Sequence, residues 1–527
     1  MASILALLCV VEAFPKPPRT IPPVNPDDPQ RLPPGVTRNV LIVGGGLAGL
    51  SAALELAEKG YNVTIHESES YVGGRAHSVK FEALGQIWQV EHGFHAWFHN
   101  YHNFQDIRKR LDIDKYFVPW EAVDYIFKDY KPESIASKGP YPLNLLGIIF
   151  DSPNLVLTDA LKAVLALPDL VEFDYNKVYQ KYDNMTLDEW ASLRRIPKDF
   201  FDIIIAPAAS VTLNDKATIS AAEMLMMMQL YFLSDSKADY RETATQNYLT
   251  ALFNPWINKL QSFGVEIKLN SSVTAFVMDE ESAAFTGITN DTTPGRYYDY
   301  VVMATDLPAI KNILTNTAEM YQNKPSLSGR VEKILQKITN LNVAPPYKVM
   351  RVWFDMQLED SRAKTILETP NFVPINLVAQ YHKLEKQYIE WANKTGGSVM
   401  EFHLYTWAHG DVPDANVWGI ISPAVKQIYP EIFDRNFTIL AYHVNTYQNF
   451  PSFEMGSASF RPNCTFAMQC GIPNAVFAGD WLHTSYPSAL MERAVSTGRE
   501  AANEILLKDR VKQVPLVVTS SYGPGIL

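Results

Sequence analysis

Three glycines and one acidic residue have the types and spacing needed to hold a dinucleotide. The sequence runs Gly44-x-Gly46-x-x-Gly49, and Glu67 follows about twenty residues later. In such a motif the first glycine permits a tight turn, the second lets the backbone approach a pyrophosphate, and the third lets a helix pack closely on a strand. The acidic residue accepts hydrogen bonds from a ribose. These residues predict a dinucleotide-binding site.

The elements that must position these residues are indicated by the sequence on both sides of the glycines. Residues 40–43 are an apolar run typical of a buried strand, and residues 62–66 form a second strand. Between them lies an alanine- and leucine-rich helix that begins at Leu47 and Ala48. Its first N–H groups and the positive end of its dipole would face the phosphates. Two strands and a helix make the βαβ unit that the site requires.

Two further motifs narrow the kind of dinucleotide. Gly74 and Arg75 end a second glycine turn shortly after the acidic residue. Far along the chain, residues 475–480 form an apolar run that ends in Gly-Asp and leads into a helix over residues 493–507. Together these motifs resemble those of the flavin amine oxidase superfamily, which includes the carotenoid desaturases. The resemblance implies that the dinucleotide is FAD.

The same resemblance assigns further contacts with FAD. It implies that Gly479 and Asp480 hold the ribityl chain, and that the backbone of Leu490 and Met491 faces the pyrimidine end of the isoalloxazine. A helix dipole at that position would stabilise an anionic reduced flavin. It also implies that the backbone of Val273 contacts the adenine.

Three segments, 89–98, 142–147 and 393–403, resemble the carotenoid desaturase branch, and the similarity as a whole covers residues 39–507. It implies an α/β fold of mixed α+β character, as in amine oxidases. A Rossmann-like FAD-binding domain is expected to interleave with a substrate domain of helices and a mixed β-sheet. The expected boundaries are 1–13 for a signal peptide, 14–38 for a proline-rich leader, 39–105, 255–310 and 470–507 for the FAD-binding domain, 106–254 and 311–469 for the substrate-binding domain, and 508–527 for a frayed tail.

Composition limits the classes of partner. The chain has 527 residues, 47% of them hydrophobic, and a formal net charge of −11. Such a chain can bury a large core, and its acidic balance gives no basic surface for nucleic acid. Since no apolar run reaches transmembrane length, we expect a soluble protein with at most peripheral membrane contact. A homodimer is compatible with these features.

The first residues and the glycosylation motifs predict the compartment. Residues 3–11 form a short apolar run that resembles a secretory signal peptide, followed by Ala13-Phe14-Pro15. A phenylalanine at that place also resembles the bipartite presequences of algae with secondary plastids, so plastid delivery is the alternative. Six Asn-x-Ser/Thr motifs favour a secreted glycoprotein: Asn184, Asn270, Asn290, Asn393, Asn436 and Asn463.

Two cysteines and a group of histidines leave alternatives open. Cys464 and Cys470 could close a small disulfide loop in a secreted protein, or remain two buried thiols. Four histidines are closely spaced and invite a metal interpretation, but no aspartate or cysteine ligands accompany them, so we expect no metal. These are His92, His95, His99 and His102.

The catalytic candidates are few because a bound flavin is itself the redox centre. Glu91, His95 and Tyr486 are the residues that would stabilise a cation or manage a proton. Arg351 is our candidate for a cation that meets a substrate carboxylate at the mouth of a tunnel. The methionine-dense segment 221–232 is either ordinary core or the wall of a hydrocarbon tunnel. Residues 145–150 are either core or the lip of a lipid opening.

Three enzymatic functions are compatible with these features. The first is an isomerase of long-chain polyunsaturated fatty acids, similar to the polyenoic fatty acid isomerase of red algae. It would pass an allylic hydride to flavin N5 and return it at another carbon to give conjugated double bonds. The second is a carotenoid desaturase, and the third is a secreted amine or amino-acid oxidase. An FAD-bearing protein without enzymatic activity is the remaining alternative.

Overall fold

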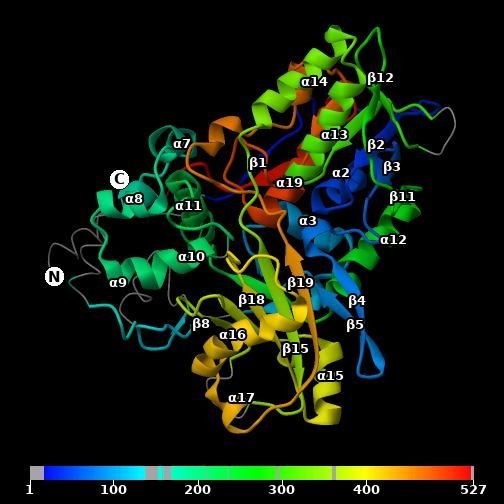
Figure 1. Ribbon diagram of the computed structural model, residues 1–527. Coiled ribbons are helices and arrows are strands. Elements are labelled where there is room, and N and C mark those ends of the chain that lie inside the picture. The colour runs from blue at the N-terminus through cyan, green and yellow to red at the C-terminus, as the bar shows by residue number, and fades with distance from the viewer. Residues whose placement is uncertain are drawn as a thin grey trace.

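The computed structural model describes most of the chain, and Figure 1 shows how its elements are arranged. The described residues are 17–120, 122–136, 152–156, 158, 168–210, 212–235, 237–291, 296–358 and 364–523. The expected signal peptide and the segments 142–147 and 145–150 lie outside them.

A five-stranded parallel sheet forms the centre of one half of the molecule, with strand order β11-β3-β2-β14-β20. Its strands come from three separate parts of the chain; Figure 1 shows β2 and β3 in blue and β11 in green. Their bounds are β2 (Asn39–Val43), β3 (Asn62–His66), β11 (Glu266–Lys268), β14 (Tyr300–Met303) and β20 (Ala475–Phe477). This is the Rossmann-like sheet that the βαβ motif predicts, and the expected α/β class is confirmed.

Helices cover both faces of this sheet. Alternate residues of strand β2 are buried in two different cores, one on each face. Val40 and Ile42 belong to the same core as α2 (Leu47–Glu58) and α19 (Leu490–Lys508). Leu41 and Val43 instead pack with α13 (Leu307–Met320) and with α14 (Pro325–Ile338). A strand buried on both faces reads as a continuous apolar run, which is what residues 40–43 show.

Helices α2 and α19 approach closely enough to require a glycine. A Cβ placed on Gly498 would lie 2.3 Å from the carbonyl oxygen of Ala48. The contact is completed by Ser51, whose hydroxyl donates to the carbonyl of Val495 at 3.0 Å. The helix that follows the first glycine motif is therefore locked against the helix that follows the Gly-Asp motif.

A second sheet of seven strands has the order β19-β15-β18-β17-β16-β8-β9. It is mixed, since β16 and β8 pair in parallel and the other neighbours are antiparallel. Its strands are β8 (Val123–Tyr125), β9 (Glu133–Ile135), β15 (Tyr347–Phe354), β16 (Ile366–Glu368), β17 (Leu377–Gln380), β18 (Ser398–Leu404) and β19 (Ile439–Tyr447). The mixed β-sheet expected beside the FAD-binding domain is therefore present.

Helices surround the second sheet and form a separate lobe at one side of Figure 1. Near the sheet lie α15 (Lys386–Thr395), α16 (Asp414–Ile428) and α17 (Pro430–Asp434). The lobe contains α7 (Tyr175–Tyr182), α8 (Leu187–Leu193), α9 (Lys198–Phe200), α10 (Ala206–Ser210) and α11 (Ala221–Met228), which continues as a π-helical stretch over Gln229–Leu233. A small sheet of β6 (Trp97–Phe98), β10 (Arg241–Ala244) and β7 (Phe117–Pro119) joins this lobe to the rest.

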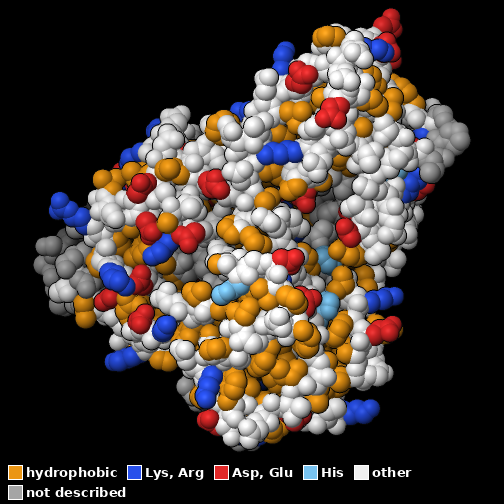
Figure 2. All heavy atoms as spheres, viewed as in Figure 1, with side chains coloured by type: hydrophobic (Ala, Val, Ile, Leu, Met, Phe, Trp, Pro, Cys, Tyr) orange, Lys and Arg blue, Asp and Glu red, His pale blue; other side chains and the backbone are white. Residues whose placement is uncertain are grey.

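Further elements complete the cofactor half. They are β4 (Ser78–Ala83), β5 (Gln86–Glu91), α3 (His102–Arg110), α12 (Asn254–Ser262), β12 (Phe276–Met278) and β13 (Phe285–Ile288). None of the helices in the described ranges is long and apolar enough to cross a membrane. On the face shown in Figure 2, lysine and arginine side chains of the described residues are scattered singly and interspersed with acidic ones.

The expected frayed tail at 508–527 is wrong for its described part. Strand β21 (Leu516–Val518) pairs with β1 (Arg19–Ile21), which belongs to the proline-rich leader. Leu516 and Val518 are buried, and they pack with Ile21 and Tyr486. A two-stranded ribbon is marginal alone, and this one is supported by the apolar contact and by hydrogen bonds between Val517 and Asn103 at 2.8 and 3.1 Å.

Candidate active site

A cavity of about 810 Å³ joins the carboxyl ends of the parallel strands to the helical lobe. Residues of the glycine motif line one part of it, and residues of α11 and of the second sheet line another. In open α/β sheets, ligands bind beyond the carboxyl ends of the strands, so the position is the expected one.

The glycine motif forms a turn that side chains would obstruct. Gly44 has φ +103°, and a Cβ on it would lie 2.6 Å from the carbonyl oxygen of Ala304. A Cβ on Gly49 would lie 2.0 Å from the carbonyl oxygen of Gly44. Gly46 precedes the first residue of α2 and lines the cavity, as do Leu47 and Ala48. The N-terminus of α2 is thus open to a phosphate.

Glu67 follows β3 and is fixed by hydrogen bonds to its carboxylate. Its Oε2 accepts the backbone N–H of Gly45 at 2.7 Å, and its Oε1 accepts the N–H of Glu69 at 2.9 Å. The residue lines the cavity, and so does Val273 on a neighbouring loop. Both therefore lie where a ribose and an adenine would be held beside the glycine turn.

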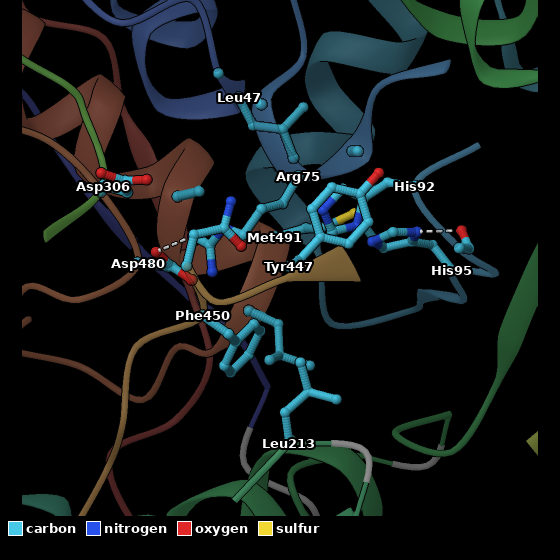
Figure 3. Close-up of a pocket in the computed structure, with 18 of the residues that line it drawn as sticks. Leu47, Arg75, His92, His95, Leu213, Asp306, Tyr447, Phe450, Asp480 and Met491 are labelled. Carbon is cyan, nitrogen blue, oxygen red and sulfur yellow. Dashed lines mark hydrogen bonds and ion pairs between the residues drawn. The ribbon is translucent and has the colours of Figure 1, made fainter. Parts of the chain in front are cut away.

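Arg75 and Asp480 meet across the cavity from two motifs that lie 405 positions apart. The Arg75 guanidinium donates to Oδ1 of Asp480 at 2.5 Å, and it lies 5.2 Å from the ring centre of Phe450 (Figure 3). Gly74, at φ +55°, and Gly479, at φ +148°, let the backbone turn at each motif and line the cavity beside them. The predicted pairing of these motifs around one ligand is present in the geometry.

The N-terminus of α19 opens onto the same cavity. Leu490 and Met491 line it, and no side chain of the preceding Ala489 caps the helix. Leu490 has φ +52°, which is uncommon for a residue with a side chain and is found at functional sites. Glu492 instead accepts the N–H of Asn103 at 2.9 Å, so its charge is directed toward α3 and away from the cavity.

The residues present fit FAD. A phosphate cradle at α2, an acid for the ribose at Glu67, a carboxylate at Asp480 and an open helix N-terminus at Leu490 follow one another along one cavity. Bound FAD would supply a hydride acceptor there.

Two histidines of the 89–98 segment line the cavity as neutral side chains. Burial lowers the pKa of His95 to about 4 and holds the pKa of His92 well below its usual value. His95 shares a hydrogen bond of 2.8 Å between Nδ1 and the carbonyl oxygen of Gly93, and His92 stacks on Tyr447 at 3.6 Å (Figure 3). Neutral imidazoles can orient a ligand or exchange one proton, without adding a charge.

Glu91 and Arg351 lie behind the cavity instead of in it. The Arg351 guanidinium donates to Oε2 of Glu91 at 2.7 Å and, through Nε, to Oε2 of Glu401 at 2.9 Å. All three side chains are almost completely buried. The Arg351 guanidinium is therefore already paired with two protein carboxylates. The expectation that Arg351 binds a substrate carboxylate is wrong.

The network around Arg351 supports the histidine loop. Oε1 of Glu401 accepts the backbone N–H of Phe94 at 2.9 Å and lies 2.8 Å from Nε2 of His403. Both His403 and Tyr405 line the cavity, and their side chains are 3.1 Å apart. Sequence reasoning missed their place in the site, although His403 ends a segment that carried the resemblance. Glu91 reaches this loop only through Arg351, which donates to it.

Tyr486 also lies outside the cavity lining. Its ring is buried against Leu516 and Val518 at the paired ends of the chain. The position of Tyr486 therefore does not support the expected role, in which it would stabilise a substrate cation or manage a proton.

Within the described part of the chain, no three histidine, cysteine or acidic side chains are placed to hold a metal ion together. Cys464 and Cys470 are free thiols, the first buried and the second partly exposed, so the structure has the unbridged alternative. All six asparagines of the glycosylation motifs are exposed.

Helix α11 provides the apolar wall of the cavity. Met224, Met227 and Met228 line it, and Tyr231 and Phe232 continue the wall beyond the helix. Met226 is 0% exposed and belongs to the core behind. The methionine-dense segment is therefore both core and cavity wall, because one side of the helix faces the cavity and the other packs in the core.

A buried ionic cluster fixes this wall to the flavin side. Glu223 of α11 accepts from Nη2 of Arg493 at 2.6 Å, from Nη2 of Arg461 at 2.8 Å and from the hydroxyl of Tyr179 at 2.6 Å. Arg493 also donates through Nε to the carbonyl of Ser488 at 2.7 Å, just before α19. Sequence gave no signal for this cluster, because its members are far apart along the chain.

Comparisons with known proteins agree with this site. A carotenoid phi-ring synthase of Streptomyces griseus is 28% identical over 89% of this chain and 87% of its own. A 15-cis-phytoene desaturase of Synechococcus elongatus is 24% identical over 89% of this chain and 96% of its own. Among solved structures, cyclohexylamine oxidase of Brevibacterium oxydans has the same fold, with a TM-score of 0.60 at 14% identity over 89% of this chain and 99% of that one.

The family assignment covers most of the chain. Residues 47–506 match the flavin containing amine oxidoreductases, a span that includes most of both halves of the fold and begins just after Gly44 and Gly46 of the glycine motif. The cofactor is FAD, as the motifs predict. The chain therefore belongs to the flavin containing amine oxidoreductase family, as an FAD-dependent oxidoreductase of its carotenoid desaturase-like branch.

Proposed function

We propose that this protein isomerises long-chain polyunsaturated fatty acids. Bound FAD would accept hydride from an allylic carbon and give it back at another carbon, so that double bonds become conjugated and no net oxidant is consumed. The observation that carries the proposal is the single cavity shared by the flavin-binding residues and the methionine wall of α11.

The cavity walls suit a flexible polyene. Met227 and Met228 are adaptable apolar side chains, and Tyr231 and Phe232 add aromatic faces beside them. Loss of hydride from a position between two double bonds leaves a delocalised cation, which requires little acid or base catalysis. The neutral imidazole of His95 is suited to lying beside such a cation without repelling it.

Desaturation of carotenoids is the second candidate, and the names of the relatives favour it. The two functions share the hydride abstraction and differ in the fate of the electrons. An isomerase returns them to the product, whereas a desaturase must pass them to an external acceptor.

One experiment separates these functions. Purified FAD-loaded protein is incubated without oxygen with arachidonic or eicosapentaenoic acid while the ultraviolet spectrum is recorded. A growing conjugated diene or triene band with unchanged product mass supports isomerisation. Absence of any band, together with a carotene product two hydrogens lighter when a quinone is added, would instead establish desaturation.

We further propose passage through the secretory pathway. The exposure of Asn184, Asn270, Asn290, Asn393, Asn436 and Asn463 supports it, because a glycan needs a surface asparagine. Protein isolated from its source should lose mass on treatment with an N-glycosidase. An unchanged mass would favour the plastid alternative.

A further inference from the structure

Arg241 lines the cavity, and its guanidinium feels Asp239 and Glu368 only from beyond ion-pair distance. It is the first residue of β10, it is only 8% exposed, and among the described residues it forms no ion pair. Its Nε is buried without a hydrogen-bond partner. Its guanidinium carbon lies 4.9 Å from the ring centre of Trp120, which also lines the cavity.

The other deeply buried arginines behave differently. Arg351, Arg461, Arg493 and Arg499 each have at least one carboxylate within ion-pair distance. A buried guanidinium without an anion has lost its hydration without compensation, and a matched anion restores much of that loss. The Arg241 guanidinium therefore faces the cavity without an ion-pair partner from the described residues.

Glu368 lies at the same end of the cavity and also lacks a side-chain partner among the described residues. It ends β16, opposite Tyr125 of β8, and both side chains line the cavity. Burial raises the pKa of Glu368 to about 8, in spite of the nearby Arg241 charge, so its carboxyl is mostly protonated at neutral pH. A protonated carboxyl can donate its O–H to an anion.

A hydrocarbon ligand would leave both groups unsatisfied, because carotenes carry no charge and no hydrogen-bonding group. A carboxylate presents two acceptor oxygens, which match the planar N–H groups of a guanidinium and one further donor. The Arg241 cation and the neutral Glu368 carboxyl together therefore favour a ligand with an anionic head group over a ligand with a hydrocarbon end.

We propose that Arg241 and Glu368 form the subsite that binds the carboxylate of the lipid substrate. This inference rests on the proposed function and names the substrate class, a free fatty acid instead of its ester or a carotene. It replaces Arg351 as the cation that such a substrate requires.

The test measures binding, so that it does not depend on turnover. The FAD-loaded protein is titrated with dodecanoate and with its methyl ester, and the perturbation of the flavin absorbance is followed at pH 7. Neither probe has a double bond, so neither can be isomerised. We expect the acid to bind about tenfold more tightly than the ester, as a charged hydrogen-bonded pair implies.

Three variants locate the preference. Arg241→Gln should remove the preference for the acid: its affinity for dodecanoate should fall about tenfold, and its affinity for the methyl ester should not change. Arg241→Lys should retain part of the preference. Arg31→Gln, at an exposed arginine, is the matched control and should bind like the wild type. Equal weakening of acid and ester, an unchanged preference in Arg241→Gln, or no binding of either probe by the wild type would overturn the proposal.

A second measurement applies if Arg241→Gln does not fold. Among the described residues, three titratable groups face Glu368: Arg241 of β10, Tyr125 of β8 and Tyr405 just after β18. Acid binding by the wild type should weaken above about pH 8, where the Glu368 carboxyl ionises. Glu368→Gln should abolish that pH dependence, and its persistence would overturn the role of Glu368.

The two proposals fail in different ways. If arachidonic acid is not isomerised but the acid preference depends on Arg241, the subsite stands and the isomerase function fails. If isomerisation occurs and Arg241→Gln keeps the acid preference, the function stands and the subsite fails.

Discussion

Replacing Glu223 with glutamine should test how the cavity wall is held. The change keeps the shape of the side chain and removes the charge shared by Arg461 and Arg493. Both guanidinium groups are at most 4% exposed at the side chain, so neither can regain water without local opening. The perturbation therefore leaves two buried cations without their anion.

The structure sets the magnitude of the effect. Burial acts to raise the pKa of Glu223, but the two arginines outweigh it and hold the pKa at about 2, below an ordinary value of 4.5. Because each tenfold change in proton affinity is worth about 1.4 kcal/mol, the charged carboxylate contributes roughly 3 kcal/mol. Loss of one partner from a buried ionic cluster costs about 3–5 kcal/mol in other proteins, which agrees.

Urea denaturation at a fixed excess of FAD would measure the loss in free energy of unfolding. The control is Glu390→Gln, since Glu390 forms an exposed (i, i+4) pair with Lys386 at 3.8 Å and should change stability by about 0.5 kcal/mol or less. A depressed acid pKa gives stability that is present above about pH 4.5 and lost as the pH falls toward 2. The difference between wild type and Glu223→Gln should therefore shrink over that window.

Two results would refute this reasoning. One is a loss at pH 7 no larger than that of Glu390→Gln. The other is a difference that stays constant from pH 7 to pH 3, because the unfolded state takes up a proton at Glu223 below about pH 4.5 and should already have removed part of the difference by pH 3.

Three further predictions concern the cofactor half. Gly498→Val should prevent stable folding or cost more than about 3 kcal/mol in thermal unfolding, because its Cβ would meet the Ala48 carbonyl at 2.3 Å, whereas Gly419→Ala, with open space around it, should be tolerated. Asp480→Asn should release FAD on dilution about tenfold more readily, measured by flavin fluorescence, and equal retention would contradict its role. His95 has a folded pKa of about 4 and an ordinary value of 6.5, so the unfolded state binds more protons between these values. Stability should fall as the pH drops through that window, and His95→Gln should reduce the slope measured by thermal unfolding.

Local patterns were sufficient to predict the cofactor half. The strand predicted at residues 62–66 matches β3 at both ends, and the helix predicted at 493–507 lies within α19. These elements are determined by the local sequence, because hydrophobic periodicity, glycine turns and helix caps depend on residues only a few positions apart. The motif residues from Gly44 to Met491 converge on one cavity because a parallel sheet brings its carboxyl ends together.

The substrate side could not be predicted in the same way. Arg351 and Arg241 are both arginines on strands, and nothing in the neighbouring sequence says which one meets two carboxylates and which one meets none. That difference depends on partners 50 and 260 positions away from Arg351, which only the tertiary structure brings near. The same reason explains why Glu91 and Tyr486 were expected in the site and lie behind it.

Charge balance separates the groups that hold the cavity from the groups that face its contents. The guanidinium groups of Arg351 and Arg493 are saturated by protein carboxylates, so removing one partner changes stability and leaves no binding energy for a ligand. Arg241 and Glu368 are nearly as buried, but the protein leaves them unsatisfied at one end of an apolar cavity. The desolvation cost of such groups is recovered when a complementary anion arrives, and a purely hydrocarbon ligand recovers none of it. The unbalanced pair is thus the feature that most distinguishes a fatty acid site from a carotene site, although the flavin half would serve both.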